Sequence, residues 1–188
     1  MEIESKLIAK CINAERKAQQ ALFEACFPFL MRLCKIYSRD DQEAMSHLNE
    51  GFYKILKGLP SWKQHIPFES WAKRIMLNAI IDHYRRQKFY RQQQQMSPEE
   101  IKLLEQKMSV VQVEDPAVNA EEMLEWLRDL PTVTSQIFSL YAIEGYSYEE
   151  ISNWLEMKQV TIRWHVWEAR KKLAARFEKV IKSHQKNL

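Results

Sequence analysis

Apolar residues recur at every third or fourth position along most of this chain of 188 residues. Spacing of this kind places apolar side chains on one face of an α-helix, and the strict alternation that is typical of half-buried strands does not occur. The chain has only three glycines and six prolines, so it offers few of the residues that hairpin turns require. The hydrophobic pattern therefore predicts an all-α protein.

In the first half of the chain the pattern predicts four helices, over residues 4–11, 15–38, 41–58 and 67–88. Asp40 or Asp41 is expected to cap the third helix, and Gly58 is expected to end it. The apolar stripe of the third helix, which should be buried, consists of Met45, Leu48, Phe52, Ile55 and Leu56.

In the second half the pattern predicts helices over 121–130 and 132–144, and then two more helices around a tight break. Ser147 and Glu150 form a capping box before the first of this pair. The break lies at Glu156-Met157-Lys158, and Val160 starts the second helix. A short capped helix, a three-residue turn and a second helix define a helix-turn-helix.

The helix after the break has an apolar stripe and an opposite basic, aromatic face. The stripe consists of Ile162, Val166, Ala169 and Leu173, and the face consists of Arg163, Trp164, Trp167, Arg170 and Lys171. The major groove of DNA admits one helix, and Arg and Lys reach base edges or phosphates there. The alternative is an ordinary helical hairpin with a solvated face, but exposed tryptophans favour a binding partner.

Between the two halves the helical pattern weakens into a polar tract at 92–95 and a break at 114–116. We therefore expect two small helical domains, over residues 1–90 and 119–188, joined by a flexible linker over 91–118. One weakly held helix is expected within the linker, around Pro98–Met108. The C-terminal domain is expected to be a helix-turn-helix domain of the winged-helix-like or tetrahelical kind.

The net charge of +3 is distributed unevenly. Residues 73–91 carry six basic side chains and one aspartate, a net charge of +5, and residues 157–188 carry nine basic and two acidic side chains, a net charge of +7. Residues 99–156 carry thirteen acidic and three basic side chains, a net charge of −10. Two positive segments suggest two contacts with a polyanion, although solvated helix faces would give the same totals.

The composition argues against several classes of protein. No apolar run of about 18 residues is present, so we expect no transmembrane helix, and the N-terminus lacks the apolar segment of a signal peptide. Cys11, Cys26 and Cys34 form no CxxC pair and should be reduced core thiols of a cytoplasmic protein. No histidine pairs with a cysteine at metal-ligand spacing, and no Gly-rich phosphate loop or nucleophile–base pair is evident. We therefore expect no enzyme, no metal and no cofactor.

The stretch GYSYEEISNWLEMKQVTIRWHVWEARKKL, from Gly145 to Leu173, resembles region 4 of the sigma-70 family, in its extracytoplasmic-function (ECF) group. The family's pattern G-x-S-Y-E-E-I-A, then T-V and R-A-R-K-x-L, is followed without a gap. In the first half, LNEGFYK at 48–54 is similar to the family's L-Q-E-x-F-x-K. The segment 68–86 is similar to F-x-x-W-L-x-R-I-x-x-N…D-x-x-R-R. The resemblance covers about 10–88 and 120–178, in the family's order.

The resemblance implies a sigma factor that binds core RNA polymerase and directs promoter-specific transcription initiation. Its N-terminal domain would bind the polymerase clamp helices through Asn49, Glu50 and Lys54. The same domain would open the promoter at the −10 element, where stacking surfaces, amides and positive charge trap unpaired bases. The residues of these kinds are Trp62, Lys73, Arg74, Asn78, Arg85 and Arg86.

The resemblance also implies that the C-terminal domain reads the −35 element. The reading positions and their neighbours are Lys158, Gln159, Thr161, Arg163, Trp164, Trp167, Glu168, Arg170 and Lys171. Trp164 stands where the family often has a small residue, and Glu168 stands where it often has a basic one. A carboxylate repels phosphate but can accept a hydrogen bond from a cytosine amino group. We therefore expect unusual −35 specificity.

The partners implied by the resemblance are core RNA polymerase, through its clamp helices and flap, promoter DNA, and an anti-sigma factor, which in this family is commonly membrane-bound. The protein is expected to be a monomer. Two other functions stay open at this point. A polymerase-independent helix-turn-helix regulator would bind duplex DNA tightly by itself. A helical interaction protein would use its basic faces for an acidic partner and show no salt-dependent DNA binding.

Overall fold

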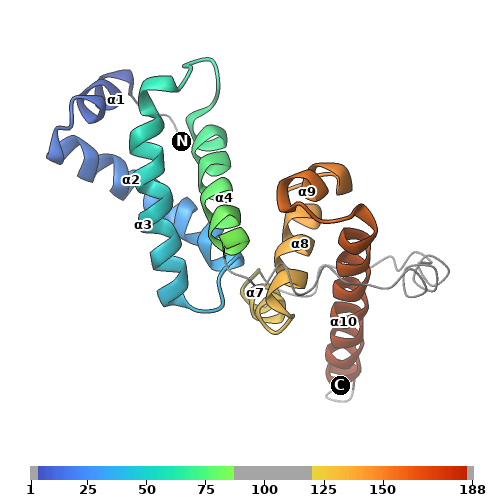
Figure 1. Ribbon diagram of the computed structural model, residues 1–188. Coiled ribbons are helices and arrows are strands. Elements are labelled where there is room, and N and C mark those ends of the chain that lie inside the picture. Colours follow the sequence, from blue (N-terminus) through green and yellow to red (C-terminus); the bar gives the residue numbers. More distant parts are fainter. Residues whose placement is uncertain (1–3, 87–119, 186–188) are drawn as a thin grey trace. The chain divides into compact units, whose positions relative to one another are not determined.

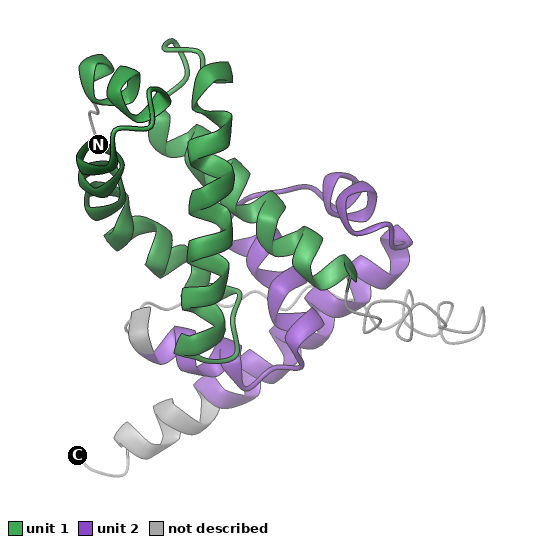
Figure 2. Cartoon of the chain, turned by 60° about the vertical axis from the view of Figure 1, so that its left-hand side comes forward, with its two compact units in different colours: residues 1–86 green, residues 87–188 purple. Residues whose placement is uncertain are grey.

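The computed structural model describes residues 4–86 and 120–185, in which all regular secondary structure is helical (Figure 1). The all-α prediction is therefore confirmed. The chain divides into two compact units, Met1–Arg86 (unit 1) and Gln87–Leu188 (unit 2), shown in Figure 2. The linker predicted over 91–118, with its helix around Pro98–Met108, lies outside the described residues.

Unit 1 contains the helices α1 (Ser5–Ile12), α2 (Arg16–Ile36), α3 (Asp41–Gly58) and α4 (Phe68–Arg86), with a short 3-10 helix, η1 (Leu59–Ser61), after α3. Helix α3 packs against both α2 and α4, and α1 packs against α2. The side chains that fill the core between these helices include Leu22, Leu30, Leu48, Ile55 and Met76, all of them fully buried. Burial of each such side chain stabilises the fold by about 1.5–3 kcal/mol.

Helix α3 begins and ends where the sequence predicts, at Asp41 and Gly58. Asp40 caps the helix, and its carboxylate accepts a hydrogen bond of 2.8 Å from the Glu43 backbone N–H. Gly58 has a φ of −82°, so α3 ends there without the left-handed backbone conformation that glycine often supplies. A Cβ at Gly58 would lie 3.1 Å from the Trp71 ring. The missing side chain therefore lets α4 approach α3 closely.

The prediction that Met45 belongs to the buried stripe of α3 is wrong. Its side chain is 40% exposed, whereas Ala44, His47 and Leu48 are buried. Because α2 and α4 both cover α3, its buried surface is broad and faces away from Met45. Gly51 also belongs to this surface, since a Cβ there would clash with the sulfur of Met76 on α4.

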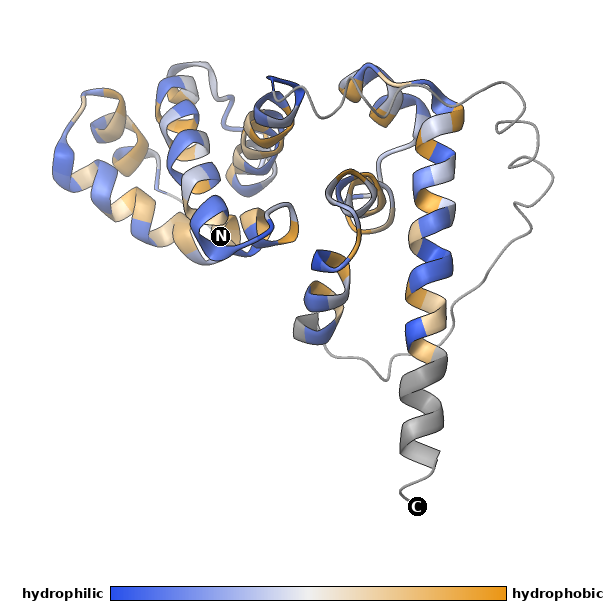
Figure 3. Ribbon diagram, turned by 60° about the horizontal axis from the view of Figure 1, so that its bottom comes forward, coloured by the Kyte–Doolittle hydropathy of each residue, from blue (hydrophilic) through white to orange (hydrophobic). Residues whose placement is uncertain are grey.

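Unit 2 contains α7 (Ala120–Arg128), α8 (Thr132–Ala142), α9 (Tyr148–Leu155) and α10 (Gln159–Gln185). Helices α8 and α9 both pack against α10. A hydrophobic cluster is formed by Leu127, Leu130, Ala169 and Leu173, with Met123, Trp126 and Phe138 packed against it. Figure 3 shows hydrophobic and hydrophilic residues interspersed along each helix, as is typical of amphipathic helices with one buried face.

The three cysteines are buried and free, as predicted. Burial raises the pKa of both Cys26 and Cys34 to about 12, so these thiols stay protonated and unreactive at neutral pH. Among the described helices, none combines the length and the apolar character that a membrane span requires.

Candidate nucleic-acid interface

The helix-turn-helix predicted from the sequence is formed by α9 and α10. Ser147 and Glu150 make the expected capping box at the start of α9. The Glu150 N–H donates to the Ser147 hydroxyl oxygen at 3.2 Å, and the Ser147 N–H donates to the Glu150 carboxylate at 2.8 Å. The capping box thereby satisfies two of the backbone donors at this end of the helix, so α9 starts at a defined residue.

The turn between α9 and α10 is held by backbone and side-chain contacts. Glu156 adopts a left-handed backbone conformation with a φ of 54°. Met157 is buried, and its carbonyl accepts a hydrogen bond of 2.5 Å from the Ser152 hydroxyl. The Lys158 carbonyl then accepts the N–H groups of Thr161 and Ile162 at 2.9 and 3.2 Å. These contacts fix the direction in which α10 leaves the turn, as a groove-reading helix requires.

The inner face of α10 is anchored to the other helices of unit 2. Its buried residues include the whole predicted stripe of Ile162, Val166, Ala169 and Leu173. His165 is 1% exposed, and its Nδ1 lies 2.9 Å from the Thr134 hydroxyl on α8. Burial lowers the pKa of His165 to about 4, so its ring is neutral at physiological pH.

The outer face of the helix-turn-helix, meaning the turn and the solvent side of α10, carries most of the predicted −35 residues. Those that are exposed are Lys158, Gln159, Arg163 and Lys171, and those that are half-buried are Trp164, Trp167 and Arg170. The Lys171 ammonium lies 5.0 Å from the centre of the Trp167 ring. This cation–π contact joins the indole and the cation into one feature of the surface.

Two tyrosines that the sequence analysis did not single out position the arginines of this outer face. Tyr141 and Tyr148 stack with their ring centres 4.5 Å apart. The Arg163 guanidinium lies 5.5 Å from the centre of the Tyr148 ring, and the Arg170 guanidinium lies 5.5 Å from that of Tyr141. Such stacking restricts the arginine side chains without neutralising their charge. Helical periodicity could not reveal the tyrosine pair, because Gly145 turns the chain between its members.

Tyr148 remains uncharged at neutral pH. Burial, together with a hydrogen bond that the Tyr148 hydroxyl donates to Tyr141, raises the pKa of Tyr148 to about 12. A phenolate would neutralise the nearby guanidinium groups, so its absence at neutral pH preserves the positive charge of the outer face.

Two of the predicted −35 residues are placed differently from the expectation. Thr161 does not lie on the outer face, because its side chain is 4% exposed in the first turn of α10. Glu168 has a side chain that is only 20% exposed, and its carboxylate lies 3.3 Å from the Lys172 ammonium. This ion pair offsets part of the negative charge that Glu168 would present to DNA. A contact from Glu168 to cytosine would use the second carboxylate oxygen or require the pair to open.

In unit 1, three of the predicted −10 residues share one face of α4. Arg74, Asn78 and Arg85 are four and seven residues apart, so they lie along one side of the helix. Arg74 and Arg85 are exposed, and Asn78 is half-buried between them. Lys73 directly precedes Arg74 and Arg86 directly follows Arg85. Each therefore lies about 100° around the helix axis from the line formed by Arg74, Asn78 and Arg85. The structure therefore does not group Lys73 and Arg86 with the other three.

Trp62 lies in the segment between η1 and α4 and is packed against aromatic neighbours. Its indole N–H donates to the Ile66 carbonyl at 3.0 Å. Its ring centre lies 5.4 Å from that of Phe68 and 6.3 Å from that of Trp71. The side chain is half-buried, so part of the ring is held by the cluster and part meets solvent. An aromatic platform that is fixed in this way could stack a base without first being ordered.

The predicted polymerase-binding residues lie on α3, but two of the three are engaged in ion pairs. Asn49 is exposed. The Lys54 ammonium lies 3.4 Å from the Glu50 carboxylate and 3.5 Å from the Asp82 carboxylate on α4. Lys54 therefore links two helices of unit 1 as well as facing solvent.

Similarity to known protein families covers both units. Residues 22–90 match the family described as Sigma-70 region 2, and residues 120–173 match the family described as Sigma-70, region 4. Each matched segment contains one of the two groups of candidate residues, the first on α3 and α4 and the second on α9 and α10.

Similarity to individual proteins extends over most of the chain. It is 25% identical over 174 residues to the ECF RNA polymerase sigma factor SigM of Mycobacterium tuberculosis (strain ATCC 25618 / H37Rv), covering 91% of this chain and 83% of that protein. It is 22% identical over 175 residues to the RNA polymerase sigma-H factor of Pseudomonas aeruginosa, covering 90% and 91%. A solved structure of CnrH in complex with the cytosolic domain of CnrY matches 92% of this chain and 96% of its own, at 19% identity and a TM-score of 0.45.

Proposed function

Because the chain belongs to the sigma-70 family and is an ECF sigma factor that directs transcription initiation, we propose that unit 1 binds core RNA polymerase and the −10 element while unit 2 reads the −35 element. The protein is not an enzyme, since sigma factors are non-catalytic subunits. RNA synthesis is therefore the work of the polymerase, and this chain selects where it starts.

The observation that carries the −35 assignment is the arrangement of arginines on the outer face of α10. Arg163 and Arg170 are held by the stacked tyrosines, so little side-chain freedom would be lost when they contact DNA. Lys158 and Gln159 stand at the start of α10, where recognition helices of this kind contact base edges. Lys171 lies further along the helix and suits a phosphate contact.

For the −10 element, the stripe on α4 and the Trp62 ring supply complementary groups. Trp71 lies three residues before Arg74 on the same side of α4 and contacts the Trp62 ring, which connects the platform to the stripe. An unpaired base can stack on the indole while the Asn78 amide meets its edge and arginines meet the phosphates. Lys73 and Arg86 would contact the backbone from the flanks.

Helix α3 would dock on the polymerase clamp helices. Asn49 lies midway between Met45 and Tyr53, which are four residues to either side and are 40% and 58% exposed. We call Met45, Asn49 and Tyr53 the α3 docking face. Exposed large apolar side chains that gather on one side of a helix are typical of a protein-binding surface. Glu50 and Lys54, as an ion pair, would border this face.

Further partners follow from family membership. The protein would act as a monomer in the cytoplasm, where promoter DNA and polymerase meet, and unit 2 would also contact the polymerase flap. An anti-sigma factor, commonly membrane-bound in this family, would control access to polymerase. The α3 docking face and the outer face of α10 are the surfaces such a factor would cover, because covering either would block initiation.

Run-off transcription tests this function directly. Core bacterial RNA polymerase is incubated with genomic promoter fragments, with and without the protein. Protein-dependent initiation at a defined start site would support the proposed roles and identify the promoter. Tight binding to duplex DNA by the protein alone, without initiation, would favour a polymerase-independent regulator. Binding to neither DNA nor polymerase would favour a helical interaction protein.

A further inference from the structure

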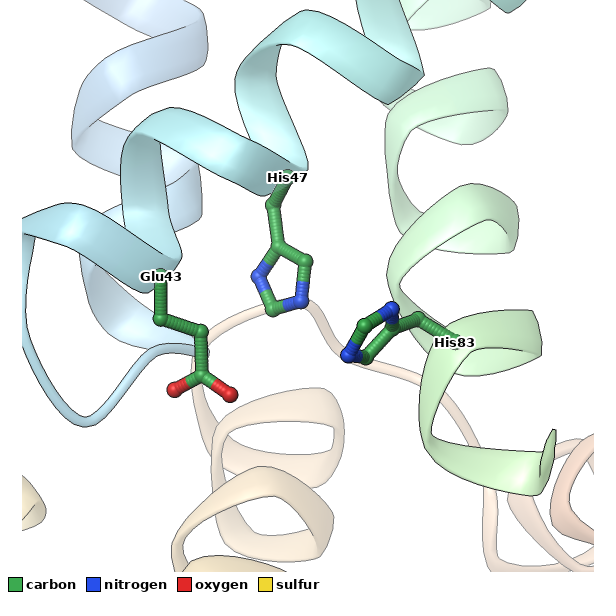
Figure 4. Close-up of side chains that lie close together, drawn as sticks. All are labelled: Glu43, His47 and His83. Carbon is green, nitrogen blue, oxygen red and sulfur yellow. The ribbon is translucent and has the colours of Figure 1, made fainter. Parts of the chain in front are cut away.

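Three side chains with metal-ligating groups converge where α3 meets α4 in unit 1. Glu43 and His47 come from α3 and His83 comes from α4 (Figure 4). One donor atom of each lies within 4.8 Å of those of the other two. Glu43 and His47 are one helical turn apart, but His83 is distant in sequence, so only the packing of α4 on α3 brings it to them.

The hydrogen bonds around His47 determine which of its ring nitrogens carries the proton. The Ser38 hydroxyl donates its single proton to the Cys34 carbonyl at 2.8 Å. It can therefore only accept from the His47 ring, whose Nδ1 lies 3.0 Å away. The ring proton accordingly resides on Nδ1, and Nε2 carries a lone pair.

This Nε2 atom of His47 is buried and makes no hydrogen bond within the described part of the chain, and the residue is 2% exposed. A buried acceptor without a partner is unfavourable, so Nε2 is free to take a further ligand. The rings of His83 and Tyr84 pack edge-on against His47, with ring centres 4.9 and 5.4 Å away, and hold its orientation. Burial also lowers the pKa of His47, which favours the neutral ring that metal coordination requires.

We propose that Glu43, His47 and His83 form a binding site for a divalent transition-metal ion, with Zn²⁺ as the ion that fits the donors best. Two imidazoles and one carboxylate suit Zn²⁺ and its first-row neighbours, whereas Mg²⁺ and Ca²⁺ prefer oxygen ligands throughout. The bond from His47 to Ser38 is the outer contact that metal-ligating histidines make through their second nitrogen. Tetrahedral coordination would place the donors about 3.4 Å apart, so the half-buried Glu43 and His83 would rotate inward.

Arg39 is the group with which the ion would compete for Glu43. The Arg39 backbone N–H donates to Glu43 Oε2 at 2.7 Å, and its guanidinium donates to Oε1 at 3.3 Å. The Arg39 side chain is 64% exposed, so the guanidinium can move into solvent while the backbone bond keeps Glu43 oriented. Glu43 would then offer Oε1 to the ion.

A bound ion would join α3 to α4, in addition to the link between Lys54 and Asp82. An ion that binds only the folded protein stabilises it. Because the α3 docking face lies on one of the two joined helices, the metal would make this helix more rigid for its partner.

The test uses the full-length chain without an affinity tag, first stripped of metal by a chelator. Calorimetry with Zn²⁺ should show one ion per chain, and the melting temperature should rise with Zn²⁺ concentration. Co²⁺ should give visible d–d absorption without a thiolate charge-transfer band. His83→Gln and Glu43→Gln should each weaken Zn²⁺ binding at least tenfold, and Ser38→Ala should weaken it by about 10–100-fold.

His65→Gln is the matched control, because it removes an exposed histidine of unit 1 outside the cluster. It should bind Zn²⁺ as the parent protein does. Unchanged affinity in both His83→Gln and Glu43→Gln would overturn the proposal, as would a parent protein that binds no Zn²⁺. A thiolate band would assign the ion to cysteines instead. Glu43 and His83 are half-buried, so their two variants keep the test decisive even where a substitution of the buried His47 or Ser38 prevents folding.

Discussion

The Nδ1 atom of His165 on α10 lies 2.9 Å from the Thr134 hydroxyl on α8, and both residues are almost fully buried. This hydrogen bond joins the helix that carries the outer face to the helix behind it. A neutral imidazole makes the bond without burying a charge, whereas a protonated ring in the same place would be strongly disfavoured. The stability of unit 2 is therefore linked to the protonation of His165.

We expect the free energy of unfolding of the protein to decrease as the pH falls below neutrality. The folded-state pKa of His165 is about 4, below the value of about 6.5 for an unfolded histidine. The unfolded state therefore takes up a proton first. The stability contributed by this residue is complete above about pH 6.5 and is lost progressively towards pH 4, by about 3 kcal/mol. Denaturant unfolding followed by circular dichroism measures the loss.

His165→Gln is the control for this titration, because its amide can bond to Thr134 but does not ionise. The variant should lose less stability than the parent over the same pH range. The pH dependence of the unfolding free energy that remains in this variant should come in part from His47, because burial also lowers the pKa of His47. An equally steep loss in His165→Gln would assign the effect to other groups.

Arg163→Ala should weaken promoter binding by the reconstituted holoenzyme. The change removes a cation that Tyr148 positions on the outer face. Loss of a base contact costs about 1–3 kcal/mol, which is roughly a 5- to 150-fold loss of affinity. Fluorescence anisotropy on the promoter and on a fragment with an altered −35 element measures it. Arg16→Ala, which removes the same charge from an exposed position on α2, should have little effect. An equal loss on both fragments would show a phosphate contact in place of a base contact.

Glu168→Ala should strengthen sequence-independent DNA binding. Removing the carboxylate releases Lys172, which lies 3.3 Å from it, to contact a phosphate. One added phosphate contact steepens the dependence of log K on log salt by about 0.9. Binding to promoter and non-promoter duplexes across a salt series checks this. If Glu168 instead reads a cytosine, the variant would change its preference at one −35 position and leave the salt slope unaltered.

Tyr53→Ala should reduce affinity for core polymerase and leave stability almost unchanged. The side chain is 58% exposed on the α3 docking face, so little packing is lost with it. An aromatic anchor at an interface typically contributes more than about 1 kcal/mol, so we expect at least a fivefold weaker complex. Ile12→Ala removes another exposed apolar side chain, 45% exposed, from α1 and should bind as the parent does. If Tyr53→Ala and Ile12→Ala bound core polymerase with equal affinity, the polymerase contact would lie elsewhere.

Features that depend on neighbouring residues could be predicted from the sequence. The Asp40 cap, the capping box at Ser147, the break at Glu156 and the buried stripe of α10 all arise from contacts between residues a few positions apart. Their chemistry is local, and the structure confirms each of them. The two family regions were recognisable for the same reason, since their motifs lie within single helices or helix pairs.

Only the tertiary structure decided which helix faces are covered and which distant side chains meet. Met45 is exposed because α3 packs between two neighbours, and the contact of Arg163 with Tyr148 crosses from α10 to α9. The approach of His47 to His83 likewise depends on how α4 lies on α3. Helix formation is governed by interactions within one or two turns, and periodicity reports them. The pairing of faces depends on the joint shapes of several helices, which no short stretch of sequence contains.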